Sequence, residues 1–233
     1  MLLKKELVYR LIAVRCKIVL CAGKPRSGST WLFNIVRLLL SNTYGFTKGF
    51  FIDDFFPGKF LLDSKSSKFL ILKIHAHDQF LVRHADIVLY SIRDLRDISA
   101  SMHRMFGISW DNSIKKIDRH VTRYFPGYKH DADYIMRYEA MISSPESTVN
   151  ELARLLKVET YDCNLILSEI NKMSYFTTDN VNKKYNLDNL LHKGHITDGR
   201  YGSWKETMPV NYIKLIENKY SEWFKQNNYP INI

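Results

Sequence analysis

Residues 17–31 read Lys-Ile-Val-Leu-Cys-Ala-Gly-Lys-Pro-Arg-Ser-Gly-Ser-Thr-Trp. The stretch opens with an apolar run, 17–22, passes through a loop rich in Gly and Ser, and enters residues 30–41, where apolar side chains recur with a helical period. A buried strand followed by a tight turn and a helix start is typical of a parallel α/β sheet. We therefore predict a strand at 17–22, a loop at 23–29 and a helix at 30–41.

The loop at 23–29 is suited to hold an anion, because backbone N–H groups and the positive end of the helix dipole converge there. Gly23, Gly28 and Thr30 fit the nucleotide-triphosphate pattern G-x-x-x-x-G-K-[ST], but Ser29 stands where the lysine belongs. Without that lysine, phosphoryl transfer lacks a main charge-neutralising group. The loop predicts a phosphate or sulfate cradle that is not an ordinary ATP site; a plain strand-to-helix turn is the alternative.

Length and charge narrow the class of protein. The chain has 233 residues, enough for one sizeable core, and no repeat or linker divides it. We predict a single domain over residues 1–233. The 34 Lys and Arg against 24 Asp and Glu give a net charge of +10, dispersed along the chain. Such an excess suits a polyanionic ligand, and a nucleotide with several phosphates satisfies it as well as a nucleic acid does.

Cysteine use and the N-terminus bear on location. Cys16, Cys21 and Cys163 are too few for a disulfide framework and favour a reducing compartment. Charged residues interrupt 1–15 before a signal-peptide core develops, and no run approaches the ~20 apolar residues of a membrane span. We expect a soluble, cytoplasmic protein without a membrane span.

The rest of the chain alternates strand and helix patterns. We expect further strands at 69–74, 86–92 and 133–136, and helices at about 95–106, 112–124, 145–157, 162–171 and 210–226. Residues 43–67 show no clear period and predict a loop with short elements, whose aromatic run 49–58 either lines a substrate pocket or packs as a flap. Strands joined by helices predict an α/β domain with a mostly parallel central sheet covered on both faces. Ligands bind such sheets beyond the carboxyl ends of the strands.

Two groups of polar residues follow predicted strands at that edge. Arg93 comes directly after the strand 86–92, and Ser101 lies eight residues further on. An arginine fork with a hydroxyl can clasp one phosphate. The alternative is that Arg93 joins its charged neighbours in an ion-pair cluster at a helix start.

Lys73, His75 and His77 end the strand 69–74 and, in an extended chain, would point to the same face. A metal site would need further ligands, and none with convincing spacing appears, so we predict no metal. A histidine beside a lysine suits general-base catalysis on a hydroxyl better, because imidazole titrates near neutral pH.

Together these stretches resemble the sulfotransferases that use 3'-phosphoadenosine 5'-phosphosulfate (PAPS), which have a P-loop-like, nucleotide-kinase-like architecture. Residues 25–31 are similar to the family's 5'-phosphosulfate loop, and Arg93 with Ser101 to its 3'-phosphate arginine and serine. Residues 73–75 resemble its Lys-Thr-His segment, Tyr138-Glu139 its Tyr-Glu-Asp stretch, and residues 195–205 its late Gly-x-Trp-Lys region. The matches occur in family order over about residues 17–206.

The resemblance implies which residues form the site. Its cofactor-binding elements would cover about 17–40, 69–106, 133–157 and 192–206. The implied catalytic residues are His75, Lys73 and Arg26. The implied cofactor-binding residues are Arg26, Ser27, Gly28, Ser29, Thr30, Trp31, Arg93, Ser101, Tyr138, Gly199 and Arg200. His75 would act as general base while an acceptor hydroxyl or amine attacks sulfur in line, with PAP, 3'-phosphoadenosine 5'-phosphate, as the product.

Three positions leave alternatives open. Arg26 stands where the cytosolic members carry lysine, which keeps the charge but not the same proton chemistry. Trp31 either stacks on adenine or belongs to the core, and 199–204 either contacts the cofactor or forms a Gly turn.

The rival functions are a P-loop kinase of small molecules and a nucleic-acid-binding module. The missing lysine and the absence of an obvious magnesium-binding acidic strand end disfavour the first, and the lack of a basic run or recognition motif disfavours the second. The acceptor, a small molecule or a glycan, is not readable from the sequence.

Overall fold

The computed structural model describes residues 2–45, 47–52, 67–175, 186, 188–191 and 199–231. Within them, five parallel strands form one sheet in the order β2-β3-β1-β4-β5. The strands are β1 (Lys17–Gly23), β2 (Lys48–Ile52), β3 (Phe69–Ile74), β4 (Ile87–Ile92) and β5 (Tyr134–Arg137). After β3 the chain crosses β1 to form β4 and β5 on its other side, and such a reversal of strand order is where open α/β sheets create a ligand site at their carboxyl edge.

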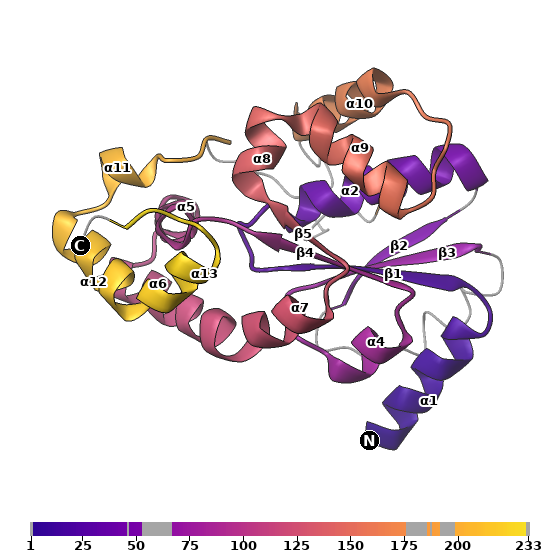
Figure 1. Ribbon diagram of the computed structural model, residues 1–233, viewed down its shortest axis with the longest axis horizontal. Helices are drawn as coiled ribbons and strands as arrows, with labels where there is room; N and C mark the ends of the chain where they lie inside the picture. The colour runs from indigo at the N-terminus through magenta and orange to yellow at the C-terminus, as the bar shows by residue number, and fades with distance from the viewer. Residues whose placement is uncertain are drawn as a thin grey trace.

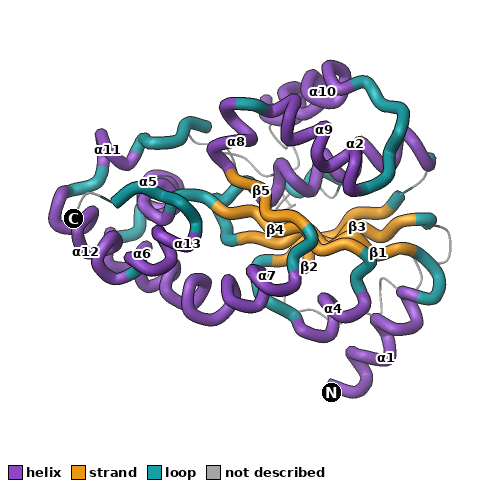
Figure 2. The backbone as a smooth tube through the Cα atoms, viewed as in Figure 1, coloured by secondary structure: helices purple, strands orange, loops and turns teal. Residues whose placement is uncertain are grey.

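Helices cover both faces of the sheet. They are α1 (Leu2–Ala13), α2 (Ser29–Tyr44), α4 (Gln79–His84), α5 (Leu95–Phe106), α6 (Trp110–Arg119), a π-helical segment η1 (His120–Tyr124), α7 (Phe125–Asp131), α8 (Tyr138–Ser143), α9 (Pro145–Leu155), α10 (Cys163–Tyr175), α11 (Trp204–Thr207), α12 (Val210–Lys219) and α13 (Ser221–Gln226). Figure 1 shows α2, α8, α9 and α10 on one side of the sheet and α1, α4 and α7 on the other, with α11, α12 and α13 gathered near α5. The tube in Figure 2 shows the same layers, with the strands as the central band.

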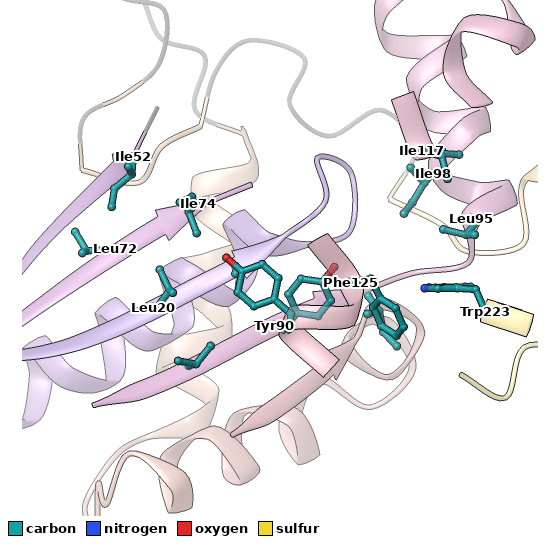
Figure 3. Packing of buried hydrophobic residues seen from close by; sticks show 14 of the residues in the cluster. Leu20, Ile52, Leu72, Ile74, Tyr90, Leu95, Ile98, Ile117, Phe125 and Trp223 are labelled. Atoms are coloured by element: carbon teal, nitrogen blue, oxygen red, sulfur yellow. The ribbon is translucent and has the colours of Figure 1, made fainter. Parts of the chain in front are cut away.

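The two faces of the sheet bury two separate apolar cores, because successive side chains of a strand point to opposite faces. In β1, Ile18 and Leu20 enter the core beneath α1, α4 and α7, whereas Val19 and Cys21 enter the core beneath α2, α9 and α10. Figure 3 shows part of the first core, from Leu72 on β3 through Tyr90 to residues near the C-terminus. The sheet is thus fixed rigidly from both sides.

The predicted parallel α/β sheet is confirmed, and β3 has the predicted bounds. The short elements expected within 43–67 include the edge strand β2; residues 53–66, including most of the aromatic run, lie outside the described residues. Two expectations differ. The predicted helix 112–124 is most of α6 followed by η1, and 210–226 is divided at Tyr220 into α12 and α13.

The strand register brings the ends of the strands together. Ala22 is level with Ile74 of β3, Gly23 with Ser91 of β4, and Ile92 with Arg137 of β5. The segments that follow these strands therefore start at the same edge, although the sequence separates them by up to about a hundred residues. None of the described helices is long and apolar enough to cross a membrane.

Candidate active site

The loop after β1 has a backbone that only certain residues permit. Gly28, with φ of 87°, lies in the left-handed region, and a Cβ there would approach the Tyr138 ring to 3.0 Å. Glycine is therefore required both by conformation and by space. At Gly23 a Cβ would come within 2.0 Å of Ser91 Oγ. Arg26 also has a positive φ, 77°, an uncommon conformation for a residue with a side chain.

The loop delivers the start of α2 to the sheet edge. Gly28 caps α2, and within the described residues no side chain accepts a hydrogen bond from the first turn. The N–H groups of this turn carry the positive end of the helix dipole, so they can receive an anion. Lys73 from β3 donates to Thr30 Oγ1 at 2.7 Å. Burial lowers the pKa of Lys73 to about 8. Its ammonium group lies against the helix start as a second source of positive charge.

His75 follows β3 and is held by the loop after β1. Its Nδ1 lies 2.6 Å from the carbonyl oxygen of Gly23. A carbonyl oxygen only accepts, so Nδ1 carries the proton and Nε2 is left with the lone pair. Burial, and then the charge of Lys73, lower the pKa of His75 to about 3. The imidazole is therefore neutral and in the tautomer of a proton acceptor.

His77, which we expected to point with Lys73 and His75, is bonded to α7, although it shares the lining of one cavity with His75. β3 ends at Ile74, so the alternation of an extended strand no longer applies at residue 77. His77 Nε2 instead contacts Asp131 Oδ2 at 3.0 Å, and its ring packs edge-on against Tyr128. Among the described residues, no three His, Cys, Asp or Glu side chains are placed to hold a metal.

Arg93 is buried at the end of β4 and connects three segments. It donates from Nη1 to the carbonyl of Arg26 at 3.1 Å and from Nη2 to the carbonyl of Arg200 at 2.7 Å. Its guanidinium stacks over the Tyr138 ring, 3.9 Å from the centroid. The buried Nε has no hydrogen-bond partner in the described part of the chain. A buried donor without a partner is costly, and an anion bound there would satisfy it.

The ion-pair cluster expected as the alternative for Arg93 forms without it. Arg96, almost fully buried, makes ion pairs with Asp94 and Glu217 and stacks on Trp204. Glu139, the acidic residue after Tyr138, accepts from the backbone N of Asp94 and from Tyr229. These contacts attach the C-terminal helices to the start of α5, so Arg93 is left to face the loop.

Arg26, Ser101 and Ser27 differ in what they face. Arg26 Nε donates to Ser101 Oγ at 2.8 Å, so the two predicted phosphate ligands lie together. Ser27 is fully buried, and its Oγ contacts Ser91 Oγ and the carbonyl of Lys24. Its side chain therefore supports the loop, and any contribution to ligand binding would come from its backbone.

Residues 199–200 lie at the same edge, with their carbonyls turned inward. Tyr138 Oη donates a hydrogen bond to the carbonyl of Gly199 at 3.0 Å. Arg93 donates a hydrogen bond to the carbonyl of Arg200. The Arg200 guanidinium is exposed, and its Nη2 lies 3.3 Å from Glu206 Oε2. Residues 192–198 of the predicted late element lie outside the described residues.

Asp97 was expected only as one of the charged neighbours of Arg93, and the sequence did not reveal its role in holding residues 202–204. It is buried on α5 and accepts hydrogen bonds from the backbone of Gly202 and Trp204 and from Ser203 Oγ. Burial raises its pKa. By holding the start of α11, Asp97 places the preceding Gly199 and Arg200 against Arg93 and Tyr138. Only its position one turn after Arg93 could have drawn attention to it.

Two cavities open at this edge. The smaller cavity, of about 380 Å³, is lined by the α2 start, Arg26, Trp31, Lys73, Arg93, Tyr138 and Gly199, with apolar side chains from α8 and α10. The larger cavity, of about 980 Å³, is lined by Lys24 and by residues of β2, the 74–80 segment, α5, α6 and η1. Pro25, His75 and Phe106 line both. His75 therefore stands at the wall between them.

These features define an α/β protein with a P-loop-like anion cradle at the carboxyl edge of a parallel sheet. The model of the sulfotransferase domain family matches residues 17–228, and the chain belongs to this family. Comparison with curated protein sequences finds no match.

Solved structures share the fold at low sequence identity. Mouse sulfotransferase SULT7A1 complexed with PAP matches over 95% of this chain and 90% of its own, with a TM-score of 0.68 and 12% identity. Retinol dehydratase in complex with retinol and PAP matches over 99% and 86%, with a TM-score of 0.63 and 16% identity. The same protein with androsterone and inactive cofactor PAP gives a TM-score of 0.59, again at 16% identity.

Proposed function

We propose that this protein transfers a sulfuryl group from PAPS to a hydroxyl or amine of an acceptor, with His75 as general base. The observation that carries the proposal is the position of His75. It lines both cavities, and its tautomer is fixed by the loop that forms the anion cradle. A base between two cavities can take a proton from a molecule in one while that molecule reacts with a group held in the other.

The smaller cavity has the donors that PAPS requires. The uncapped α2 start with Lys73 and Thr30 suits the 5'-phosphosulfate, as backbone N–H groups and a cation do for such anions. Arg93, whose buried Nε has no partner in the described chain, suits the 3'-phosphate together with Ser101 and Arg26. Trp31 lines this cavity and offers a ring face to the adenine.

Gly199 and Arg200 take a more limited part in this proposal. Gly199 lines the smaller cavity, whereas the Arg200 side chain lies beside Glu206. We assign to Arg200 the indirect role of fixing Arg93 through its carbonyl. Tyr138 stacks on the Arg93 guanidinium and so fixes the orientation of this planar group.

The chemistry divides among the residues as follows. PAPS, when bound, supplies the sulfuryl group, and PAP carries away the electron pair of the broken S–O bond. His75 Nε2 takes the proton of the acceptor as the new bond to sulfur forms. Negative charge develops on the leaving oxygen, and the Lys73 ammonium, Arg26 and the N–H groups of the α2 start stabilise it. These donors are fixed beforehand, so little reorganisation is needed during the reaction.

The low pKa of His75 fits this role once the anion is considered. Lys73 and Lys24 contribute to lowering it. A bound nucleotide brings negative charge beside these ammonium groups and so raises the pKa of His75. The base therefore becomes stronger when the sulfuryl donor is in place.

Calorimetry with PAP and with ATP, followed by transfer of labelled sulfate from PAPS to pooled acceptors, tests the proposal. We expect PAP to bind without magnesium and more tightly than ATP, and at least one pool to become labelled. Tighter binding of ATP with magnesium, or labelling of no pool by a protein that ignores PAP, would contradict it.

A further inference from the structure

The larger cavity has a wall of positive charge. Lys115, Lys116 and Arg119, on neighbouring turns of α6, line it together with Lys24 of the anion loop. We call these four residues the cationic wall. The three on α6 are exposed, whereas Lys24 is buried and donates to the carbonyl of Lys116 at 2.6 Å. Burial and then the charges of Lys116 and Arg119 lower the pKa of Lys24 to about 8. Lys116 and Arg119 are therefore close enough to repel the Lys24 ammonium.

Carboxylates do not balance this charge. In the described parts of the chain, neither Lys115, Lys116 nor Arg119 has a carboxylate partner. The acidic residues of α6 turn elsewhere, since Asp118 pairs with Lys219 and Asp111 accepts from Tyr212.

Among the described residues that line the larger cavity, one is a carboxylate, and it is already engaged. Asp78 accepts from the backbone N of Phe80 and Leu81 through Oδ1, and from Tyr9 through Oδ2. The cavity therefore has a positive potential, which favours a negatively charged ligand.

Much of the remaining lining is apolar and aromatic, beside the polar side chains of Gln79, Asn112 and three histidines. Phe51, Phe80 and Phe106 line the larger cavity, with Ile108 and Tyr124. Aromatic faces suit a ring, and cations placed beside them suit acidic substituents on that ring. A neutral, wholly apolar acceptor would leave the cationic wall without a partner.

We propose that the acceptor is an anion: a ring-bearing molecule that carries a hydroxyl for sulfation and a carboxylate or sulfate group that the cationic wall binds. This rests on the proposed function, because His75 must take the proton of that hydroxyl between the two cavities. The chemistry is met by an aromatic hydroxy acid and by an acidic sugar alike. The ring faces the aromatic side chains, and the acidic group faces α6.

Binding of matched probes to the PAP-saturated protein, measured by calorimetry, tests this proposal. One pair is 4-hydroxyphenylacetate and its methyl ester, and the other is methyl glucuronide and methyl glucoside. We expect at least one acid to bind about tenfold more tightly than its neutral counterpart at low salt, and this ratio to fall as salt is added. The two pairs distinguish an aromatic acid from an acidic sugar. Neutral probes that bind as tightly as the acids, or acids that do not bind at all, would overturn the proposal.

Variants locate the effect. The double substitution Lys116→Gln with Arg119→Gln removes two exposed charges of the cationic wall, and Arg154→Gln on α9 is the control with an exposed charge elsewhere. We expect the double variant to lose most of the acid preference, and Arg154→Gln to keep it. Both should bind PAP as the parent does and unfold at the same temperature. An unchanged acid preference in the double variant would overturn the proposal, as would weakened PAP binding, which would assign the wall to the nucleotide.

The same samples distinguish failure of this proposal from failure of the proposed function. If PAP binds and labelled sulfate is transferred equally well to the neutral probes, the acceptor class is wrong and the sulfotransferase function stands. If neither PAP binding nor transfer occurs, the function itself is wrong.

Discussion

The two cavities at the sheet edge are built in different ways. The polar lining of the smaller one comes mainly from residues that directly follow strands or begin α2, and these are buried or half-buried within the fold. The larger one takes most of its charged wall from exposed residues of α6. The polar lining of the smaller cavity is therefore inseparable from the fold, whereas most of the charge of the larger one lies on one exposed helix face. His75, which belongs to both, should show the largest effect on activity.

His75→Ala should lower turnover at least ~100-fold, the usual scale for loss of a general base. Because His75 contacts the loop through a single hydrogen bond to Gly23, PAP binding should remain nearly intact. Steady-state kinetics and calorimetry on the same sample separate the two effects. Unchanged turnover would remove His75 from the mechanism, and a parallel loss of PAP binding would show that its role is to support the cradle.

Arg93→Ala should affect the smaller cavity alone and weaken PAP binding by ~1.5–3 kcal/mol, the range for a charged hydrogen-bonding group. Binding of adenosine 5'-phosphosulfate, which lacks the 3'-phosphate, should hardly change. Arg93 also holds two loop carbonyls, so Arg93→Lys, which keeps the charge but not the fork, is the matched variant. Equal losses for both nucleotides would mean that Arg93 acts by fixing the loop rather than by binding the 3'-phosphate.

The pH dependence of kcat/KM should show a basic limb near pH 8 and no acid limb from His75 above pH ~5. The pKa of His75 is lowered to about 3, so its neutral form is present at every higher pH. The pKa of Lys73 is lowered to about 8, so its charge is lost as the pH rises through that value, and the rate should fall up to about tenfold per unit.

Lysine-to-arginine variants identify which group causes the basic limb, because Lys24 on the acceptor side has a similar pKa. Lys73→Arg should move the limb to higher pH, and Lys24→Arg should leave it in place. If Lys24→Arg moves the limb and Lys73→Arg does not, the charge that supports the reaction is that of Lys24 in the larger cavity.

Stability should fall as the pH drops below about 6.5. Burial lowers the pKa of His120, and it stacks on Tyr90 in the core beside the larger cavity. The unfolded chain binds protons below its histidine pKa while the native His120 and His75 do not, so acid favours unfolding by up to roughly 1.4 kcal/mol per pH unit for each. Urea unfolding at pH 7.5 and 5.5 measures this. His120→Gln should flatten the dependence, and an equally steep curve in that variant would contradict the assignment to His120.

Arg200→Ala should have the smallest effect, changing PAP binding less than about threefold. Its exposed ion pair with Glu206 contributes little, and its carbonyl, which holds Arg93, is retained in the variant. Glu206→Gln is the matched control for the ion pair. A loss as large as that of Arg93→Ala would show that the Arg200 side chain turns inward when the nucleotide binds.

The gathering of residues around the smaller cavity could be predicted from sequence, because local patterns specify the strands that carry them. Continuous apolar runs mark β1, β3 and β4, and the residues directly after them must meet at one edge once the strands are parallel. Gly28 marks the turn because its positive φ disfavours residues with a side chain.

Other features depend on contacts that no local pattern records. β2 has aromatic residues and Gly in place of a regular period, and it forms because the edge of β3 is available to pair with it. β3 ends at Ile74, and His77 beyond it pairs with Asp131 of α7, a residue 54 positions away. The cationic wall escaped notice because Lys24 and α6 are about ninety residues apart, and the role of Asp97 because its partners are more than a hundred residues away.

The exposure of Lys115, Lys116 and Arg119 has a consequence for how such a protein changes over generations. Substitutions at these three exposed positions remove no buried side chain and keep the Lys116 carbonyl that Lys24 contacts, so they can accumulate at little cost to folding. In the proposed scheme, a duplicated copy of this gene could then acquire a different acceptor through a few changes on one helix face. The same freedom is denied to Gly23 and Gly28, where an added methyl group would meet Ser91 of β4 or Tyr138 of α8.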